Sequence, residues 1–310
     1  MAKTHPGGLS IGFRRGWGDW QRDLALLVRF ARENNFEFID FGPASCEELS
    51  RVLDAGMGIG SVDLKEWKAL VSPDAARRGA AVDANIRYVL DVTGLGIKNF
   101  LAVVSPEDPS RKRSENFELA VDSFGQLARE VRSAGARIVI EGAPGPAPWH
   151  GSIACTPADA RAFFAALAER FGPEAAETIG LNFDPSHLVR MGIAPERFLA
   201  EFLPRIHHVH GKDTELLEAG QYAHGNLQPA TFDSPHRFGG HHWRYAIPGR
   251  GAVKWPPLLS ALQAGGYRGG VSIELEDEQF NGTEAGEKQG LREARDFLSA
   301  EGRSERQGAG

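Results

Sequence analysis

Short apolar runs alternate with longer amphipathic stretches along the chain, and this alternation constrains the fold more than any other feature. In one stretch Val121, Phe124, Ala128 and Val131 recur at the spacing that places them on one face of a helix. The pattern predicts eight strands with helices between them, at residues 9–13, 36–41, 57–62, 100–105, 137–141, 179–184, 205–210 and 270–274.

Eight strand–helix units in succession indicate an α/β fold, the (β/α)₈ TIM barrel, which usually takes about 250 residues and more with insertions. The chain of 310 residues is long enough for it. The competing fold is an open doubly wound sheet, which would need a glycine-rich phosphate loop after the first strand. The turn there holds Gly16 and Gly18 around Trp17 but lacks a third glycine, so the barrel is favoured. We predict one barrel domain over residues 1–301 and a flexible tail over 302–310.

A long segment interrupts the alternation after the seventh strand. Between about residues 211 and 251 the sequence has no helical period, and it is too aromatic for a disordered linker. In a barrel this segment would lie on the catalytic face, so we predict a lid whose Trp243 and Tyr245 cover the substrate. The substrate-binding residues expected in it are Asp213, His242 and Arg244. A subunit contact is the alternative, because aromatic and arginine residues also suit interfaces.

The composition excludes several functional classes. A net charge of −6 argues against non-specific nucleic-acid binding, which needs a basic face. No apolar run approaches the roughly 20 residues that span a bilayer, and residues 1–13 lack a signal-peptide pattern. The two cysteines, Cys46 and Cys155, are too few for a disulfide framework. We therefore expect a cytoplasmic protein with neither a membrane nor a nucleic acid as its partner.

Four consecutive predicted strands each end in a residue of a metal-binding type, namely Glu141, Asp184, His210 and Glu274. Active sites of such barrels lie at the C-terminal ends of the strands, so these four side chains would meet at one rim. Three carboxylates there would repel one another unless a positive charge lay among them. An oxygen-rich set of this kind predicts one divalent metal ion, with Mn²⁺ preferred and Mg²⁺, Co²⁺ and Zn²⁺ as alternatives.

Each of these residues has a simpler interpretation when it is taken alone. Asp184 precedes a proline and could begin a turn. Glu276 competes with Glu274 because both point the same way along a strand, and Glu274 is preferred because it ends the apolar run. Arg14 and Lys65, after the first and third strands, are expected to be exposed. Polar residues that support the metal site inside the barrel are predicted two positions before three of the ligands, at Asn182, His208 and Ser272.

The motifs around these residues resemble a known family. Glu141 in IVIEG, Asp184 and His187 in LNFDPSH, His210 in HVHGKD and Glu274 in SIELE are similar to the xylose isomerase-like TIM-barrel superfamily. That superfamily holds sugar isomerases and epimerases, inosose dehydratases and endonuclease IV-type DNA-repair enzymes. Residues 186–255 look most like bacterial proteins described as sugar phosphate isomerases/epimerases.

The resemblance also implies roles for individual residues. In the ketose 3-epimerases of this superfamily, the residues that match Glu141, Asp184, His210 and Glu274 hold one Mn²⁺ or similar ion. The matches of Glu141 and Glu274 exchange the proton at the reacting carbon, and the match of His187 contacts the substrate. Glu141, Glu274 and His187 are accordingly the expected catalytic residues.

This resemblance implies a divalent-metal-dependent sugar isomerase or epimerase. A carboxylate would abstract the proton next to the sugar carbonyl, and the metal would stabilise the resulting enediolate. Lys212 or His187 would steady the developing oxyanion. His150, in a proline-rich loop, would line the sugar site or act as a second base. The expected partner is a small-molecule sugar, free or phosphorylated.

Other functions share part of this pattern. A metal-dependent lyase would begin with the same proton abstraction and then eliminate a group one carbon further on. Inosose dehydratases work in this way, as do C-glycoside deglycosidases that act on 3-oxo-glycosides beside a small β-sandwich partner subunit. The chain would then form a hetero-oligomer with a small β-protein, whereas an epimerase could be a homo-oligomer.

Two further alternatives fit less well. A non-catalytic sugar-binding barrel would not need four metal ligands. A three-metal nuclease of the same superfamily would need histidines from the early strands, whereas this chain has only His5 before His150.

Overall fold

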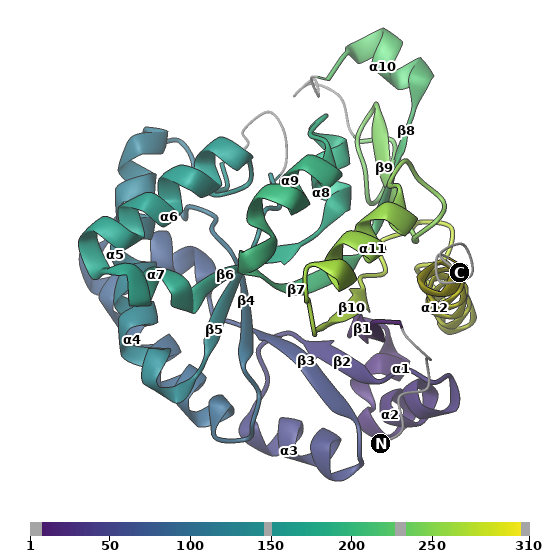
Figure 1. Cartoon of the computed structure of the whole chain (residues 1–310), viewed down its shortest axis with the longest axis horizontal. Helices are drawn as coiled ribbons and strands as arrows, with labels where there is room; N and C mark the ends of the chain where they lie inside the picture. Colours follow the sequence, from purple (N-terminus) through teal and green to yellow (C-terminus); the bar gives the residue numbers. More distant parts are fainter. Residues whose placement is uncertain (1–7, 146–150, 227–233, 305–310) are drawn as a thin grey trace.

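A closed barrel of parallel strands forms the centre of the structure, a computed structural model that describes residues 8–145, 151–226 and 234–304. Within these residues, eight strands close in the order β1-β10-β7-β6-β5-β4-β3-β2, and helices surround them (Figure 1). The predicted TIM barrel is therefore confirmed, and the alternative of an open doubly wound sheet is wrong. The barrel strands are β1 (Ser10–Arg14), β2 (Phe38–Phe41), β3 (Gly58–Asp63), β4 (Asn99–Val103), β5 (Arg137–Glu141), β6 (Ile179–Phe183), β7 (Ile206–Gly211) and β10 (Gly270–Ile273).

The helices cover the barrel with their apolar faces. In α5 the four residues predicted to share a face, Val121, Phe124, Ala128 and Val131, are completely buried. Burial of such a face removes apolar surface from water, which stabilises the fold by about 25 cal/mol per Å². The helices around the barrel are α1 (Asp19–Arg22), α2 (Leu24–Glu33), α3 (Cys46–Asp54), α4 (Ala75–Thr93), α5 (Arg113–Val131), α6 (Pro157–Phe171), α7 (Pro173–Thr178), α8 (Pro185–Arg190), α9 (Pro195–Phe202), α11 (Trp255–Ala264) and α12 (Glu284–Ser304), with 3₁₀ turns at Trp67–Val71, Arg132–Ala134 and Leu203–Arg205.

The barrel interior is filled by side chains, and its lower layer is built around one aromatic ring. Phe38 points into the lumen from β2, where one glycine each on β1, β3 and β10 makes room for it. A Cβ atom at Gly12, Gly60 or Gly270 would collide with Phe38. The next inward residue of β2 is Asp40, because side chains of a strand alternate between its two faces. The interior therefore changes from apolar to polar towards the C-terminal ends of the strands.

The segment after β7 folds as a strand pair with a short helix, rather than as the irregular loop that the sequence predicts. β8 (Asp213–Leu216) pairs antiparallel with β9 (Trp243–Ala246), and α10 (Glu218–His224) lies between them in the chain. Figure 1 shows β8, β9 and α10 extending beyond the barrel. Trp243 and Tyr245 are buried and Arg244 between them is half-buried, which is the alternation of a strand packed on one face. Strands of four residues are too short to give a clear period in the sequence.

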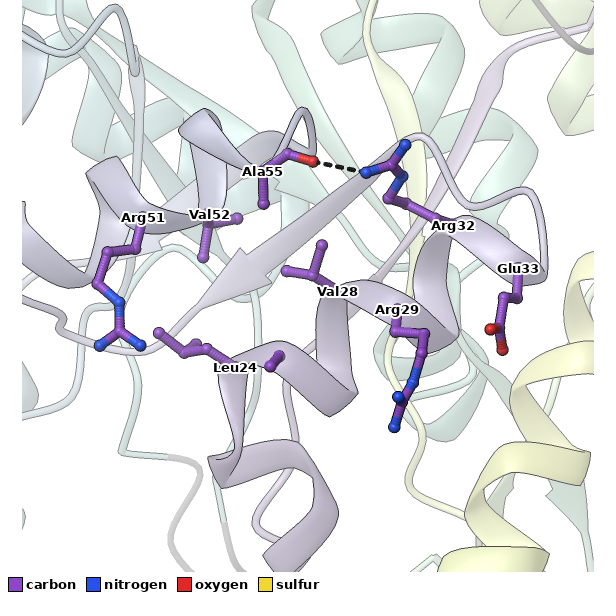
Figure 2. A pocket seen from close by; sticks show the side chains of 9 residues that line it. Leu24, Val28, Arg29, Arg32, Glu33, Arg51, Val52 and Ala55 are labelled. Atoms are coloured by element: carbon purple, nitrogen blue, oxygen red, sulfur yellow. Dashed lines mark hydrogen bonds between the residues drawn. The ribbon is translucent and has the colours of Figure 1, made fainter.

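A groove on the outside of the barrel lies between α2 and α3 (Figure 2). Its cavity volume is about 530 Å³, and Val28 and Val52 face one another across it. Arg32 at one end donates a hydrogen bond of 3.1 Å to the carbonyl of Ala55. None of the predicted site residues lines this groove, so it is separate from the candidate site.

The last helix, α12, continues to Ser304, into the stretch that the sequence predicts as a tail, and residues 305–310 lie outside the described residues.

Across the described ranges, no helix has both the length and the apolar content that crossing a membrane requires.

Candidate metal centre

The four predicted metal ligands meet at the C-terminal rim of the barrel. Glu141 ends β5, Asp184 follows β6, His210 lies in β7 and Glu274 follows β10. One ligand atom of each lies within 4.8 Å of the ligand atoms of the other three. They meet because parallel strands carry their carboxyl ends to the same rim. The structure thus brings together Glu141, Asp184, His210 and Glu274, named the rim cluster below.

The local structure leaves one carboxylate oxygen of the rim cluster without a donor. Asp184 is the N-cap of α8, and its Oδ1 accepts hydrogen bonds from the backbone N–H of Ser186 (2.9 Å) and from the Ser186 hydroxyl (2.6 Å). Its Oδ2 is buried and accepts no hydrogen bond, although the Lys212 ammonium lies 3.3 Å from it. A desolvated oxygen without a hydrogen bond is costly, and a bound cation would offset that cost. The donor set and this oxygen therefore fit a hard divalent ion.

The charges of the rim cluster depend on one another. His210 Nδ1 lies 2.9 Å from Glu141 Oε1 and 3.4 Å from Glu274 Oε2. Burial alone would raise the pKa of Glu141, but the imidazoles of His210 and His187 hold it well below its usual range. Burial likewise opposes the charged form of His210, yet Glu274 and Glu141 hold the pKa of its ring well above the usual value. Positive charge among these carboxylates is thus strongly favoured.

Lys212 supplies the other positive charge next to the rim cluster. Its side chain is buried, and its Nζ lies 2.5 Å from Glu274 Oε2, 3.0 Å from Glu276 Oε2 and 3.3 Å from Asp184 Oδ2. Burial disfavours the ammonium, but the carboxylates, Glu274 foremost, keep its pKa well above the usual value. Of the two glutamates that compete in the sequence, Glu274 lies in the rim cluster, and Glu276 pairs with Lys212.

His187 lies beside the rim cluster on the first turns of α8. Its Nε2 is 3.5 Å from Asp184 Oδ2 and 3.6 Å from Glu141 Oε1. Its Nδ1 lies 2.6 Å from the hydroxyl oxygen of Tyr245, which comes from β9. The ring therefore bridges the rim cluster and the inserted segment.

A polar layer lies directly below the rim cluster, as predicted. Asn182 donates a hydrogen bond of 3.2 Å to Glu141 Oε1, and His208 Nε2 lies 2.7 Å from Asp40 Oδ2. Ser272 is completely buried on β10. The inward orientation predicted for Asn182, His208 and Ser272 is confirmed. Such outer partners orient metal ligands, and His210 Nε2 lies 3.8 Å from Asp40 Oδ2.

Three charged residues of the site were missed or misjudged from the sequence. Arg14, expected to be exposed, has a side chain only 17% exposed and donates two hydrogen bonds to Asp63, of 2.8 and 2.5 Å. Its Nε also lies 3.4 Å from Glu274 Oε1. Burial raises the pKa of Asp63 against the opposing charge of Arg14, whereas His208 holds the pKa of buried Asp40 below its usual value. Arg14, Asp40 and Asp63 all sit at the C-terminal ends of β1–β3, so the rule applied to the later strands would have found them.

The predicted lid residues take different places. Asp213 is buried, and its carboxylate accepts hydrogen bonds from the N–H groups of Thr214, Gly249 and Val253 and from the indole of Trp255. These bonds close the inserted segment onto the barrel and do not place Asp213 in the rim cluster.

Two other predicted substrate-binding residues also lie apart from the rim cluster, and one cannot be placed. Arg244 pairs with Glu215 and Glu278. His242 is buried, and no hydrogen bond joins it to the rim cluster in the described part of the chain. His150 lies outside the described residues.

A cavity of about 390 Å³ opens next to the rim cluster. Its lining includes the charged residues Arg14, Asp63, Glu274 and Glu276. It also includes apolar and aromatic groups, among them Trp17, Trp67, Pro43, Leu275 and Leu291. The cavity therefore has room for a part of a ligand that extends beyond the rim cluster.

Comparisons with known proteins agree with this architecture. The chain is 37% identical over 101 residues to the protein YfiH of Bacillus subtilis, a match that covers 32% of this chain and 31% of the relative. It is 28% identical over 102 residues to an inosose dehydratase of Lacticaseibacillus casei, covering 33% of this chain and 32% of the relative. The matched segment spans about a third of the length of these curated relatives.

Solved structures match over nearly the whole chain at low identity. A D-psicose 3-epimerase determined in the presence of D-fructose has a TM-score of 0.66 at 17% identity, covering 93% of this chain and 98% of that structure. The 3-keto-D-glucoside 4-epimerase YcjR of E. coli has a TM-score of 0.65 at 15% identity, covering 94% and 99%. These likenesses show the fold. The family model described as xylose isomerase-like TIM barrel matches residues 19–301, and the chain therefore belongs to the xylose isomerase-like TIM-barrel family.

Proposed function

We propose that the chain is a divalent-metal-dependent enzyme that abstracts a proton next to the carbonyl of a sugar, as an isomerase or epimerase does. The observation that carries this proposal is the rim cluster, in which three carboxylates and one imidazole converge within 4.8 Å. Arg14 and Lys212 pair with carboxylates of this cluster, but they also pair with two further carboxylates, Asp63 and Glu276. Such an excess of buried carboxylate is the usual surrounding of a bound cation.

Glu141, Asp184, His210 and Glu274 would hold the ion, and Mn²⁺ is the preferred occupant. When bound, a divalent ion would polarise the carbonyl oxygen of the sugar and so acidify the neighbouring C–H bond. The partners already in place would keep the ligands oriented, since Asn182 is hydrogen-bonded to Glu141.

Glu141 and Glu274 are the proposed proton-transfer groups. In the barrel order β6 and β7 separate β5 from β10, so the two carboxylates reach the rim from different sides. Burial opposes ionisation of both, but the imidazoles of His210 and His187 beside Glu141 and the ammonium of Lys212 beside Glu274 hold each pKa below its usual value. Both carboxylates are therefore ionised and able to accept a proton. One would take the proton from carbon, and the other would return one to the opposite face. Lys212 and His187 would donate hydrogen bonds to substrate oxygens.

A lyase is the second candidate, because elimination begins with the same proton abstraction. Two observations favour it. The matched relatives include inosose dehydratases, and the cavity beside Glu274 carries two tryptophans that suit a bulky leaving group. In this case the C–H bond and a C–O or C–C bond one carbon further on would both break. The substrate would be an oxo-glycoside or an oxo-sugar.

Exchange with solvent deuterium tests both candidates. The full chain loaded with Mn²⁺ is incubated in D₂O with a panel of ketoses, ketose phosphates and 3-oxo-glycosides, and the protein is removed before ¹H NMR. An epimerase would incorporate deuterium at one carbon and give a second sugar, whereas a lyase would release an aglycone or water. Exchange without metal, or no exchange with any member of the panel, would contradict the proposal.

A further inference from the structure

Tyr245 connects the inserted segment to the centre of the site. It lies on β9, and its side chain is buried. Its hydroxyl oxygen is 2.6 Å from His187 Nδ1 and 3.3 Å from Arg190 Nη1. The Nζ of Lys212 lies 4.4 Å from the centre of its ring. A residue far along the chain from α8 thus contacts three charged or ionisable groups of the site.

The direction of the hydrogen bond between Tyr245 and His187 follows from these contacts. A guanidinium can only donate, so Arg190 occupies a lone pair of the Tyr245 oxygen. Burial raises the pKa of Tyr245 well above its usual value, so the hydroxyl keeps its proton. Among the described residues His187 Nδ1 is the one acceptor in reach of that proton. Nδ1 is therefore the unprotonated nitrogen, and a neutral imidazole then carries its proton on Nε2.

Nε2 faces the rim cluster, at 3.5 Å from Asp184 Oδ2 and 3.6 Å from Glu141 Oε1. With its proton there, His187 presents a donor towards the space where a substrate oxygen would bind. It presents no lone pair with which to bind a metal or to remove a proton from carbon.

Tyr245 is itself held firmly. The guanidinium of Arg190 also donates a hydrogen bond of 2.8 Å to the carbonyl of Gly145 and lies 3.9 Å from the centre of the Trp243 ring. The Trp243 and Tyr245 rings are in contact, with centres 4.7 Å apart. One arginine thus ties the loop after β5, helix α8 and strand β9 together.

We propose that Tyr245 is a positioning residue that fixes His187 in the tautomer with the proton on Nε2, so that His187 serves the site as a hydrogen-bond donor and not as a base or a metal ligand. The catalytic part of this inference rests on the proposed function, whereas the tautomer itself does not. Loss of an outer partner of a metal ligand typically lowers activity by about 10- to 100-fold, and we expect a loss of at least about tenfold when Tyr245 no longer orients His187.

The tautomer can be observed directly by ¹⁵N NMR of the full chain labelled in its ten histidines and loaded with diamagnetic Mg²⁺. The His187→Asn variant identifies the His187 signals by their loss. We expect Nε2 protonated and Nδ1 unprotonated in the wild type, and a mixture of both tautomers in Tyr245→Phe. Tyr267→Phe is the matched control, because it removes a buried hydroxyl that donates 2.9 Å to the Gly270 carbonyl at the other end of the barrel. This control should leave the His187 signals unchanged.

Two results would overturn the inference. One is a wild-type His187 protonated on Nδ1, and the other is an unchanged Nε2–H tautomer in a folded Tyr245→Phe variant. Deuterium exchange measured on the same variants separates this inference from the proposed function. If the tautomer responds as expected but no sugar exchanges in the wild type, the inference stands and the proposed function fails. If sugars exchange and Tyr245→Phe loses the tautomer, the kcat of Tyr245→Phe should be at least about tenfold lower than that of the wild type. Tyr267→Phe should keep both the tautomer and the kcat of the wild type.

Discussion

The buried ammonium of Lys212 lies 2.5 Å from Glu274 Oε2, and the side chain of Glu274 is 15% exposed where it lines the cavity. Replacing Lys212 with methionine would leave Glu274, Glu276 and Asp184 without their shared cation. Loss of one partner from a buried ion pair typically costs about 3–5 kcal/mol, so the metal-free variant should be destabilised by that order. Added Mn²⁺ should recover part of the loss, because the ion would supply positive charge to the same carboxylates.

Urea denaturation with and without Mn²⁺ measures this effect. Lys254→Met is the control, since Lys254 is exposed, and a change within about 0.5 kcal/mol is expected there. Equal stability of the Lys212 variant and the wild type without metal would show that the three carboxylates do not depend on Lys212.

Glu141 and Glu274 should each be essential for turnover. Glu141→Gln and Glu274→Gln remove a charged ligand and a proton acceptor together, so kcat should fall by about 10²-fold or more. Glu293 lies on α12 and forms an exposed ion pair with Arg250, so Glu293→Gln should leave kcat within about twofold. Retained turnover in either site variant, with metal still bound, would place the base elsewhere.

Trp243 should hold the inserted segment over the site. Its ring packs on the guanidinium of Arg190, and its loss would free Tyr245. Trp243→Ala should therefore lower turnover and leave the oligomeric state unchanged in light scattering after size-exclusion chromatography. Tyr222→Ala, at a residue 95% exposed on α10, should change neither. Dissociation of an oligomer into active monomers by Trp243→Ala would instead identify the segment as a subunit interface.

The stability of the fold should fall in mild acid because of His207. Burial, with help from Arg137 and Arg205, lowers the pKa of His207 from 6.5 to about 4. Between these values the unfolded chain takes up a proton that the folded chain refuses, so stability is full above pH 6.5 and is lost as the pH falls towards 4. At about 1.4 kcal/mol per pH unit, the loss between pH 6.5 and 4 is at most about 3.5 kcal/mol, and solvent around the partly exposed ring makes it smaller. In His207→Gln this loss should be absent. Urea titrations at several pH values measure the free energy of unfolding of both proteins. An equal dependence on pH in the two proteins would contradict this role of His207.

The sequence predicts the rim cluster well because each member depends on a local pattern. Glu141, Asp184, His210 and Glu274 each end a predicted strand, and the parallel barrel then brings these ends together. Arg14 was misjudged because the carboxylate that holds it, Asp63, is 49 positions away in the chain. No local pattern reports such a pair, although reading the ends of all eight strands would have placed both residues at the rim.

The inserted segment was harder to predict because its contacts are distant in the chain. Asp213 is of a residue type that often binds substrate hydroxyls, yet its carboxylate accepts hydrogen bonds from N–H groups up to 42 positions away. Tyr245 reaches His187 across 58 positions. These contacts depend on how the segment folds back onto the barrel. The local spacing of apolar residues does not predict such long-range contacts.

The most direct test of the account is anomalous scattering from crystals grown with Mn²⁺. We expect one strong peak per chain, at about 2.0–2.6 Å from an oxygen of Glu141, Asp184 and Glu274 and from a ring nitrogen of His210. Asp184→Asn should weaken that peak or abolish it. A peak that contacts Asp40 and His208 instead, or no peak with the four side chains in place, would contradict the central claim that these residues form the metal centre.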